Sequence, residues 1–179
     1  MPSAELDFGA YPKLHGVRAN FICDSSGHYK VDGSSRGLSS PDDRKLISHL
    51  RSITDAVIVG GETARAEQYR QSTRFETLVF TRHPETLPAG LKPLEFQDRD
   101  SLRELFWGLR GDHTSILIEA GPTLLRSFLE WRQVDQLCLT INGLERPAQA
   151  IAEELFQNPL GEPDLVQVVS ASRYCIWNL

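Results

Sequence analysis

The stretch SILIEAGPTLLRSFLEWRQVDQLCLTI, residues 115–141, decides how the chain is expected to fold. Its first apolar run, 116–118, is typical of a short buried strand and stops at Glu119-Ala120-Gly121-Pro122-Thr123. Leucines and a phenylalanine then recur at helical spacing, and a second apolar run follows at 137–141. The stretch therefore predicts a strand, a helix and a second strand, with an unusual turn after the first strand.

The same alternation continues on both sides of this stretch. Ser40-Pro41-Asp42-Asp43 is a helix start: the serine can cap, the proline suits the first helical position, and Asp43 can close a capping box. The remaining expected elements are strands at 17–23, 56–59 and 78–80, helices at 102–109 and 148–155, and a hairpin within 164–179. Short apolar strands alternating with amphipathic helices predict one α/β domain, residues 1–179, with a mainly parallel sheet covered on both faces. The closing hairpin predicts an antiparallel edge.

Composition limits the class of protein. The 179 residues are 40% hydrophobic and carry a formal net charge of −5, which disfavours non-specific nucleic-acid binding. No apolar run is long enough to span a membrane, and MPSAELDFGAYPK lacks the pattern of a signal peptide. Cys23, Cys138 and Cys175 lie in or beside apolar runs without paired spacing. We therefore expect buried thiols, no metal site and a cytoplasmic location.

Two strand ends carry candidate phosphate-binding motifs, because ligands of parallel sheets bind outside the carboxyl ends of the strands. Gly121 lets an anion approach the backbone, Pro122 opens a helix whose free N–H groups point at that spot, and Thr123 adds a hydroxyl. Gly60-Gly61 with Thr63 forms a second candidate pyrophosphate cradle. The alternative, that these glycines simply turn the chain, remains open.

Thr81-Arg82 follows a strand that lies between these two in the chain. A hydroxyl and a guanidinium at this point suit the 2′-phosphate of NADP, although a surface arginine at a strand exit is common. Glu119 cannot favour a phosphate, so it is expected to hydrogen-bond a neutral group or the backbone.

The segment 33–40 offers hydroxyl and backbone N–H groups beside a helix start. Arg44 and Arg51 follow on one helical face, where they either hold an anionic or polar substrate or lie in solvent. No GxGxxG, HExxH or GxSxG motif is present, and the five histidines form no recognisable pair.

Three segments together resemble the pyrimidine reductase family, the reductase domain of riboflavin biosynthesis within the dihydrofolate reductase-like superfamily. They are VRANF at 17–21, DGSSRGLSSPDDRKLISHLRSITDAVIVGGETARAE at 32–67, and the stretch at 115–141. The resemblance implies a three-layer α/β/α dihydrofolate reductase-like fold, NADPH as hydride donor and usually a homodimer. The family reduces the ribose of a phosphorylated aminopyrimidine, 5-amino-6-(5-phosphoribosylamino)uracil, to a ribityl chain.

The resemblance also implies roles for individual residues. The positions that match the cofactor site are Gly60, Gly61, Thr63, Thr81, Arg82, Gly121, Pro122, Thr123 and Leu124. The positions that match the substrate side are Ser35, Arg51, Glu67 and Glu119. No catalytic residue is assigned.

The departures from the family fall mainly on the substrate side. Ser26 stands where the family has an aspartate, and Glu67-Gln68-Tyr69 replaces Asp-Asp-Pro. Ala120 replaces the first glycine of Glu-Gly-Gly-Pro, and the segment after residue 141 lacks the family's glycine-rich run. The leading hypothesis is therefore an NADPH-dependent reductase of a pyrimidine-linked sugar or similar small substrate. A non-catalytic nucleotide-binding relative with a regulatory or structural role, and a dimeric domain without ligand, are the alternatives.

Overall fold

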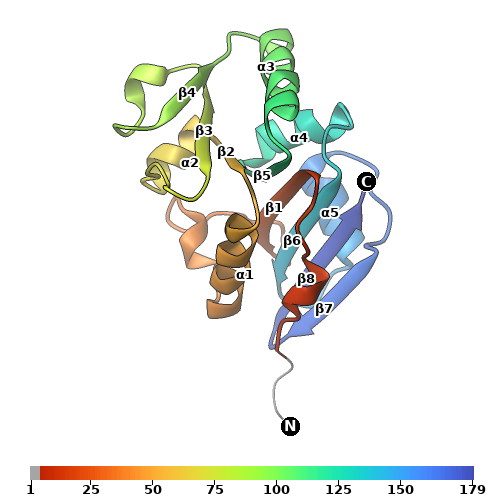
Figure 1. Ribbon diagram of the computed structural model, residues 1–179. Helices are drawn as coiled ribbons and strands as arrows, with labels where there is room; N and C mark the ends of the chain where they lie inside the picture. Colours follow the sequence, from red (N-terminus) through yellow and green to blue (C-terminus); the bar gives the residue numbers. More distant parts are fainter. Residues whose placement is uncertain (1–4) are drawn as a thin grey trace.

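A computed structural model shows eight strands in one sheet within residues 5–179 (Figure 1). Residues 1–4, which belong to the predicted domain and to the segment compared with a signal peptide, lie outside the described residues. The strands are β1 (Gly16–Asp24), β2 (Ala56–Gly60), β3 (Glu76–Thr81), β4 (Lys92–Glu95), β5 (Ser115–Glu119), β6 (Gln136–Asn142), β7 (Leu165–Val169) and β8 (Ser172–Asn178). Their order is β4-β3-β2-β5-β1-β6-β8-β7. The pairs from β4 to β6 are parallel, and β8 and β7 add an antiparallel hairpin, as predicted.

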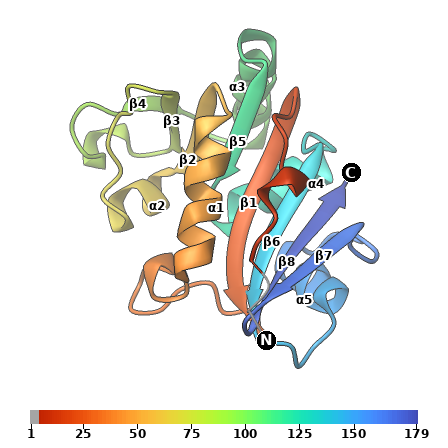
Figure 2. The ribbon, with the colours of Figure 1, turned by 60° about the horizontal axis from the view of Figure 1, so that its bottom comes forward.

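The helices cover both faces of this sheet (Figure 2). They are α1 (Pro41–Ser52), α2 (Gly61–Ala66), α3 (Arg99–Asp112), α4 (Pro122–Glu130) and α5 (Ala148–Phe156). Apolar side chains of α1 and α2 pack on one face with Val57, Val59 and Leu117, while α3, α4 and α5 pack on the other with Ile58 and Ile118. Burial of these two apolar clusters is the main stabilising contribution to the three-layer architecture.

The start of α1 differs from the sequence prediction in one respect. The Ser40 hydroxyl accepts the backbone N–H of Asp43 and Pro41 occupies the first turn, as expected. Asp43 does not close a capping box, because its carboxylate accepts hydrogen bonds from the Ser39 hydroxyl at 2.6 Å and the Thr140 hydroxyl at 2.9 Å. That carboxylate therefore links the helix start to the sheet.

β3 lies on the outer side of the two strands that carry the glycine motifs. Although β3 follows β2 in the chain, β2 pairs with both β3 and β5. The two glycine-bearing strand ends are thus immediate neighbours in the sheet, and Thr81-Arg82, which falls between them in the chain, lies to one side of them in the sheet.

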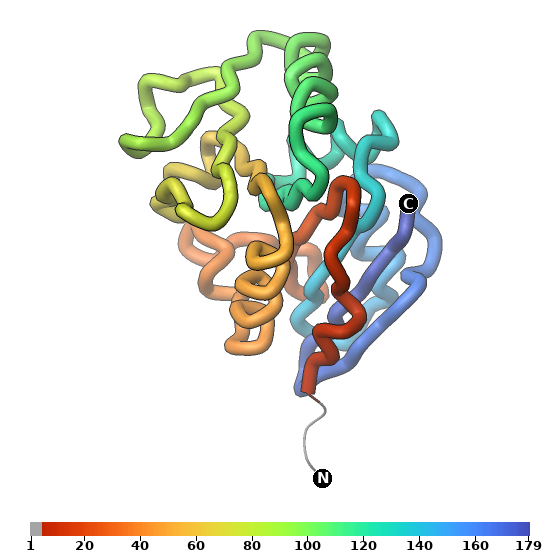
Figure 3. The backbone as a smooth tube through the Cα atoms, viewed as in Figure 1, coloured from red at the N-terminus to blue at the C-terminus, as the bar shows by residue number. Residues whose placement is uncertain are grey.

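β1, which comes from the N-terminal part of the chain, lies in the middle of the sheet beside strands from the second half of the chain (Figure 3). β1 lies between β5 and β6, and the helix after β1 packs on one face whereas the helix after β5 packs on the other. The loops that leave β1 and β5 therefore diverge, which opens the type of crevice in which α/β sheets bind ligands. None of the helices within residues 5–179 has the length and apolarity needed to span a lipid bilayer.

Candidate functional site

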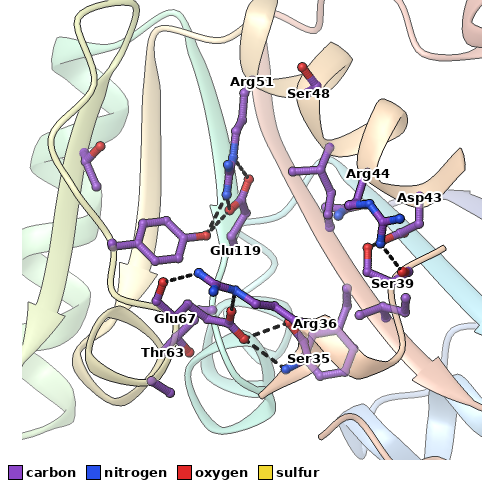
Figure 4. A pocket seen from close by; sticks show the side chains of 18 of the residues that line it. Ser35, Arg36, Ser39, Asp43, Arg44, Ser48, Arg51, Thr63, Glu67 and Glu119 are labelled. Carbon is purple, nitrogen blue, oxygen red and sulfur yellow. Dashed lines mark hydrogen bonds and ion pairs between the residues drawn. The ribbon is translucent and has the colours of Figure 1, made fainter. Parts of the chain in front are cut away.

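A cavity of about 890 Å³ lies beside the carboxyl ends of β1 and β5. Its walls come from α1, from the loop between β1 and α1, and from the segment that follows α2 (Figure 4). Among residues 5–179, six cationic and three carboxylate side chains line it: Lys30, Arg36, Arg44, Arg51, Arg70, Arg74, Asp43, Glu67 and Glu119. This excess of positive charge favours an anionic ligand on a protein whose net charge is negative.

Arg51, Glu119 and Tyr69 form a closed hydrogen-bonded group on one wall. The Arg51 Nε donates to Glu119 Oε1 at 2.8 Å, and its Nη2 donates to Glu119 Oε2 and, at 2.8 Å, to the Tyr69 hydroxyl. The Tyr69 hydroxyl in turn donates to Glu119 Oε2. The end of β5 is thereby joined to two earlier segments of the chain, the end of α1 and the segment after α2.

The contacts within this group shift the pKa values of Arg51 and Tyr69. Burial alone lowers the pKa of the Arg51 guanidinium, but the hydrogen bonds and charge of Glu119 outweigh burial, and the pKa is raised. Burial, followed by the charge of Glu119, raises the pKa of the Tyr69 hydroxyl well above its ordinary value. The group therefore consists of a neutral phenol and an ion pair. Glu119 accepts a hydrogen bond from a neutral group, the Tyr69 hydroxyl, as expected, but it also pairs with the Arg51 guanidinium, which the sequence did not predict.

Glu67 fastens the loop in front of α1. Its Oε1 accepts the Ser34 hydroxyl at 2.6 Å, and the backbone N–H and hydroxyl of Ser35 at 2.9 and 3.1 Å. Its Oε2 lies 2.8 Å from the Arg36 Nε. Burial tends to raise the pKa of Glu67, but these hydrogen bonds and the charge of Arg36 lower it below its usual range. Ser35 and Glu67 both line the cavity, and they bond to each other there.

Asp43 and Arg44 lie on the α1 wall of the cavity. The Arg44 Nη1 donates to the backbone carbonyl of Ser39 at 2.6 Å. Burial raises the pKa of Asp43, although the hydrogen bonds from Ser39 and Thr140 act in the opposite direction. Sequence reasoning placed Arg44 and Arg51 on one helical face correctly. It did not identify Asp43 as a cavity residue, because Asp43 stands three residues after Ser40, where a capping-box residue is expected.

The N-terminus of α4 opens onto the same cavity through Gly121. Its φ of −63° is ordinary, and a Cβ added to Gly121 would meet nothing nearer than the Thr63 hydroxyl at 4.0 Å. No side chain caps α4, and Pro122 has no N–H. The first-turn N–H groups of Thr123 and Leu124 therefore remain for an anion.

The glycines at the junction of β2 and α2, Gly60 and Gly61, have a structural role. A Cβ on Gly61 would lie 2.6 Å from the Thr81 hydroxyl, and a Cβ on Gly60 would lie 3.1 Å from Leu124 Cδ1. Gly61 is thus required for α2 to start against β3, and Gly60 lets α4 pack against β2. Thr63 is the member of this motif that lines the cavity.

Thr81 and Arg82 lie outside the cavity lining. Thr81 is buried, and its hydroxyl accepts the backbone N–H of His83 at 3.0 Å. Arg82 is exposed, with its guanidinium carbon 5.3 Å from the centre of the Phe96 ring. The ring holds the guanidinium at the strand end without occupying its N–H donors.

The three cysteines are buried and unpaired within residues 5–179, as predicted. Burial raises the pKa of Cys23 and Cys138 to about 12 and that of Cys175 to about 11, so these thiols are not nucleophiles at neutral pH. The described part of the chain contains no group of three metal-ligating side chains placed to hold an ion.

No protein-family model and no curated protein matches this sequence. Solved structures do match. A pyrimidine reductase-like protein from Corynebacterium diphtheriae is 20% identical with a TM-score of 0.69, over 96% of both chains. RibD from Acinetobacter baumannii is 17% identical with a TM-score of 0.68, over 96% of this chain and 60% of RibD.

Dihydrofolate reductase from Enterococcus faecalis, complexed with NADP(H), is 16% identical with a TM-score of 0.64, over 92% of this chain and 96% of the enzyme. Identities this low establish a shared fold rather than a shared activity. This chain has the dihydrofolate reductase-like fold, as its motifs predicted.

Proposed function

We propose that the chain is an NADPH-dependent reductase that transfers hydride to a pyrimidine-linked sugar or a similar small anionic substrate. The observation that carries this proposal is the cationic cavity, which opens directly beside the uncapped N-terminus of α4. One ligand can thus lie across the strand ends while a second fills the cavity next to it. The likeness to structures of RibD and of dihydrofolate reductase supports the same reading.

The cofactor is assigned to the strand ends. The open space in front of Gly121 fits a pyrophosphate, which the N–H groups of Thr123 and Leu124 and the Thr63 hydroxyl would hold. Arg82 would hold the 2′-phosphate that distinguishes NADPH from NADH. Gly60, Gly61, Thr81 and Pro122 would shape this site through packing. NADPH supplies a hydride when bound.

The substrate is assigned to the cavity. Arg44, Arg70 and Arg74 line it, and no carboxylate lies within ion-pair distance of them among residues 5–179. We assign an anionic group of the substrate, such as a phosphate, to these arginines. Ser35, Arg51, Glu67 and Glu119 shape the rest of the pocket through the bonds they make to one another and to Tyr69.

The test is a fluorescence titration with NADPH and with NADH, followed by an assay of NADPH consumption. We expect NADPH to bind at micromolar concentration and NADH to bind at least tenfold more weakly. If neither nucleotide binds, the proposal is contradicted, and the alternative of a structural domain without ligand is favoured. Binding without consumption across a panel of phosphorylated pyrimidines would favour the non-catalytic alternative.

We also propose that the chain acts as a cytoplasmic homodimer, as the resemblance to the pyrimidine reductase family implies. Light scattering after size-exclusion chromatography would give twice the mass of the chain, and a monomeric mass would contradict this.

A further inference from the structure

The two edges of the sheet are built differently. β4, at one edge, contains Lys92, Pro93 and Glu95, and such residues prevent an edge strand from pairing with another chain. β7, at the other edge, reads Leu-Val-Gln-Val-Val and contains no charged residue and no proline. No strand within residues 5–179 lies on the outer side of β7 (Figure 1, Figure 2). One edge is therefore blocked, and the other is open.

β7 also exposes apolar side chains. Of the seven large hydrophobic side chains exposed within residues 5–179, three lie on this strand: Leu165, Val166 and Val168, which are 38%, 44% and 49% exposed. Val166 lies opposite Cys175 of β8, which packs in the apolar cluster that α5 covers. Because opposite residues of an antiparallel pair share a face, Val166 and Val168 form an exposed apolar strip on the α5 side of the sheet.

The geometry of the β7–β8 hairpin determines which backbone groups of β7 are free. Val169 and Ser172 flank a two-residue turn in which Ser170 has a φ of 56°, so Val169 and Ser172 exchange the first pair of hydrogen bonds. Hydrogen-bonded and non-hydrogen-bonded pairs alternate along antiparallel strands, so the N–H and C=O groups of Val166 and Val168 point away from β8. The residues of the apolar strip thus also carry the free backbone groups of the open edge.

We propose that β7 pairs antiparallel with β7 of a second copy of this chain, about a twofold axis at Gln167. The proposal rests on the homodimer proposed above and names its interface. In this register Val166 of one copy lies opposite Val168 of the other, so their free backbone groups bond to each other and the two apolar strips join. A second copy fits this edge because the edge is complementary to itself under a twofold rotation. Asp164, which precedes β7, lies opposite Ser170 of the second copy, so like charges do not meet.

The first experiment measures the mass of wild type, Val168→Lys and Val31→Lys by light scattering after size-exclusion chromatography. Val31 is 43% exposed in the loop before α1, so Val31→Lys is the matched control. A five-residue strand forms a small interface, and the proteins are therefore compared at about 100 μM, where a micromolar dimer is populated. Val168→Lys places a charge within the joined strip. We expect wild type and Val31→Lys to have twice the mass of the chain, and Val168→Lys to have the mass of one chain.

The outcomes separate this inference from the proposals on which it rests. Circular dichroism and the melting temperature report whether each variant is folded. A folded Val168→Lys variant that remains dimeric would overturn the assignment to β7 and leave the homodimer standing. A monomeric wild type would overturn both and leave the open edge to a strand of another protein. NADPH binding is measured independently, so failure of the reductase proposal would leave the mass results unchanged.

The second experiment needs no variant. Amide hydrogen exchange of the wild type is measured by mass spectrometry at single-residue resolution, at about 100 μM and at about 1 μM protein. We expect the N–H groups of Val166 and Val168 to exchange at least about tenfold more slowly at the higher concentration, because the second copy accepts their hydrogen bonds. The N–H groups of Gln167 and Val169 bond to β8 and should be protected at both concentrations. Exchange at Val166 and Val168 that does not depend on concentration would overturn the proposal.

Discussion

Gly121 is the residue at which a small change has the clearest consequence for ligand binding. Its backbone angle is ordinary and the space before it is open, so Gly121→Val should fold with a melting temperature within a few degrees of wild type. The added methyl groups would occupy the place of the pyrophosphate, and we expect NADPH affinity to fall at least about 100-fold. A fluorescence titration measures this.

Gly61→Ala is the matched comparison. Its Cβ would lie 2.6 Å from the Thr81 hydroxyl, so the main effect should be a loss of stability of about 1–3 kcal/mol. If Gly121→Val binds NADPH normally, the pyrophosphate-binding site does not lie at Gly121. If it unfolds, Gly121 has a structural role instead.

Arg82 is expected to select the phosphorylated cofactor. Its guanidinium lies over the Phe96 ring and makes no hydrogen bond within residues 5–179, so Arg82→Ala should remove a contact worth about 1.5–3 kcal/mol to a 2′-phosphate. NADPH affinity should fall about 10- to 100-fold while NADH affinity stays the same. Parallel titrations with the two nucleotides measure this, and equal losses would remove Arg82 from the role.

Tyr69 stabilises the cavity wall through its hydroxyl. Tyr69→Phe removes a donor to Glu119 and an acceptor for Arg51, which should lower the free energy of unfolding by about 1–3 kcal/mol. The control is Tyr29→Phe, since no hydrogen bond of that hydroxyl is found within residues 5–179. Urea denaturation compares the two, and an equal effect of both changes would show that the hydroxyl of Tyr69 contributes nothing particular.

At the scale of elements, the loop before α1 depends on the ionised form of Glu67. The folded-state pKa of Glu67 lies below its unfolded value, so its stabilising effect is complete above the unfolded pKa. It is lost as the pH falls through the folded-state pKa. We expect wild type to exceed Glu67→Gln by about 1–3 kcal/mol at pH 7, and the difference to shrink below pH 4.

Denaturation of the wild type and of Glu67→Gln between pH 3 and pH 7 measures the difference in their free energies of unfolding. The other carboxylates are the same in both proteins, so their contribution cancels in this difference. A gap between the two proteins that is constant over the whole range would mean that the charge of Glu67 does not anchor the loop.

Helices and strands that are marked by a local sequence pattern could be predicted. Contacts between residues that lie far apart in the sequence could not. Ser40 and Pro41 predict the start of α1 to within two residues, and apolar runs predict the buried strands. α2 has six residues, too few to show a helical period, and β4 has no buried side chain to mark it. The Arg51–Glu119 pair joins residues 68 positions apart, which no spacing rule relates. The packing requirement at Gly61 was not predictable, because a glycine required by packing has the same sequence signature as one required by a ligand.

At the scale of the whole molecule, we predict that the cavity accepts the substrate of the pyrimidine reductase family poorly. Tyr69 stands where the family has proline, and its hydroxyl already engages both Arg51 and Glu119. Polar groups of 5-amino-6-(5-phosphoribosylamino)uracil that depend on those two residues would each lose about 1–3 kcal/mol. We expect a kcat/KM below roughly 10⁴ M⁻¹s⁻¹ for this compound, with NADPH binding retained. A steady-state assay that gives a higher value would identify an ordinary pathway reductase.

The central place of β1 has a consequence for biosynthesis. Gly16 pairs with Ser115 and Arg18 pairs with Gln136, so the strand made first receives its neighbours only when most of the chain exists. At about 5–20 residues per second, a ribosome needs on the order of 5–20 s to supply them. During that interval β1 lacks both of the strands that pair with it. Nascent chains interrupted before β5 should therefore fail to fold and depend on chaperones, since their central strand remains without either neighbour.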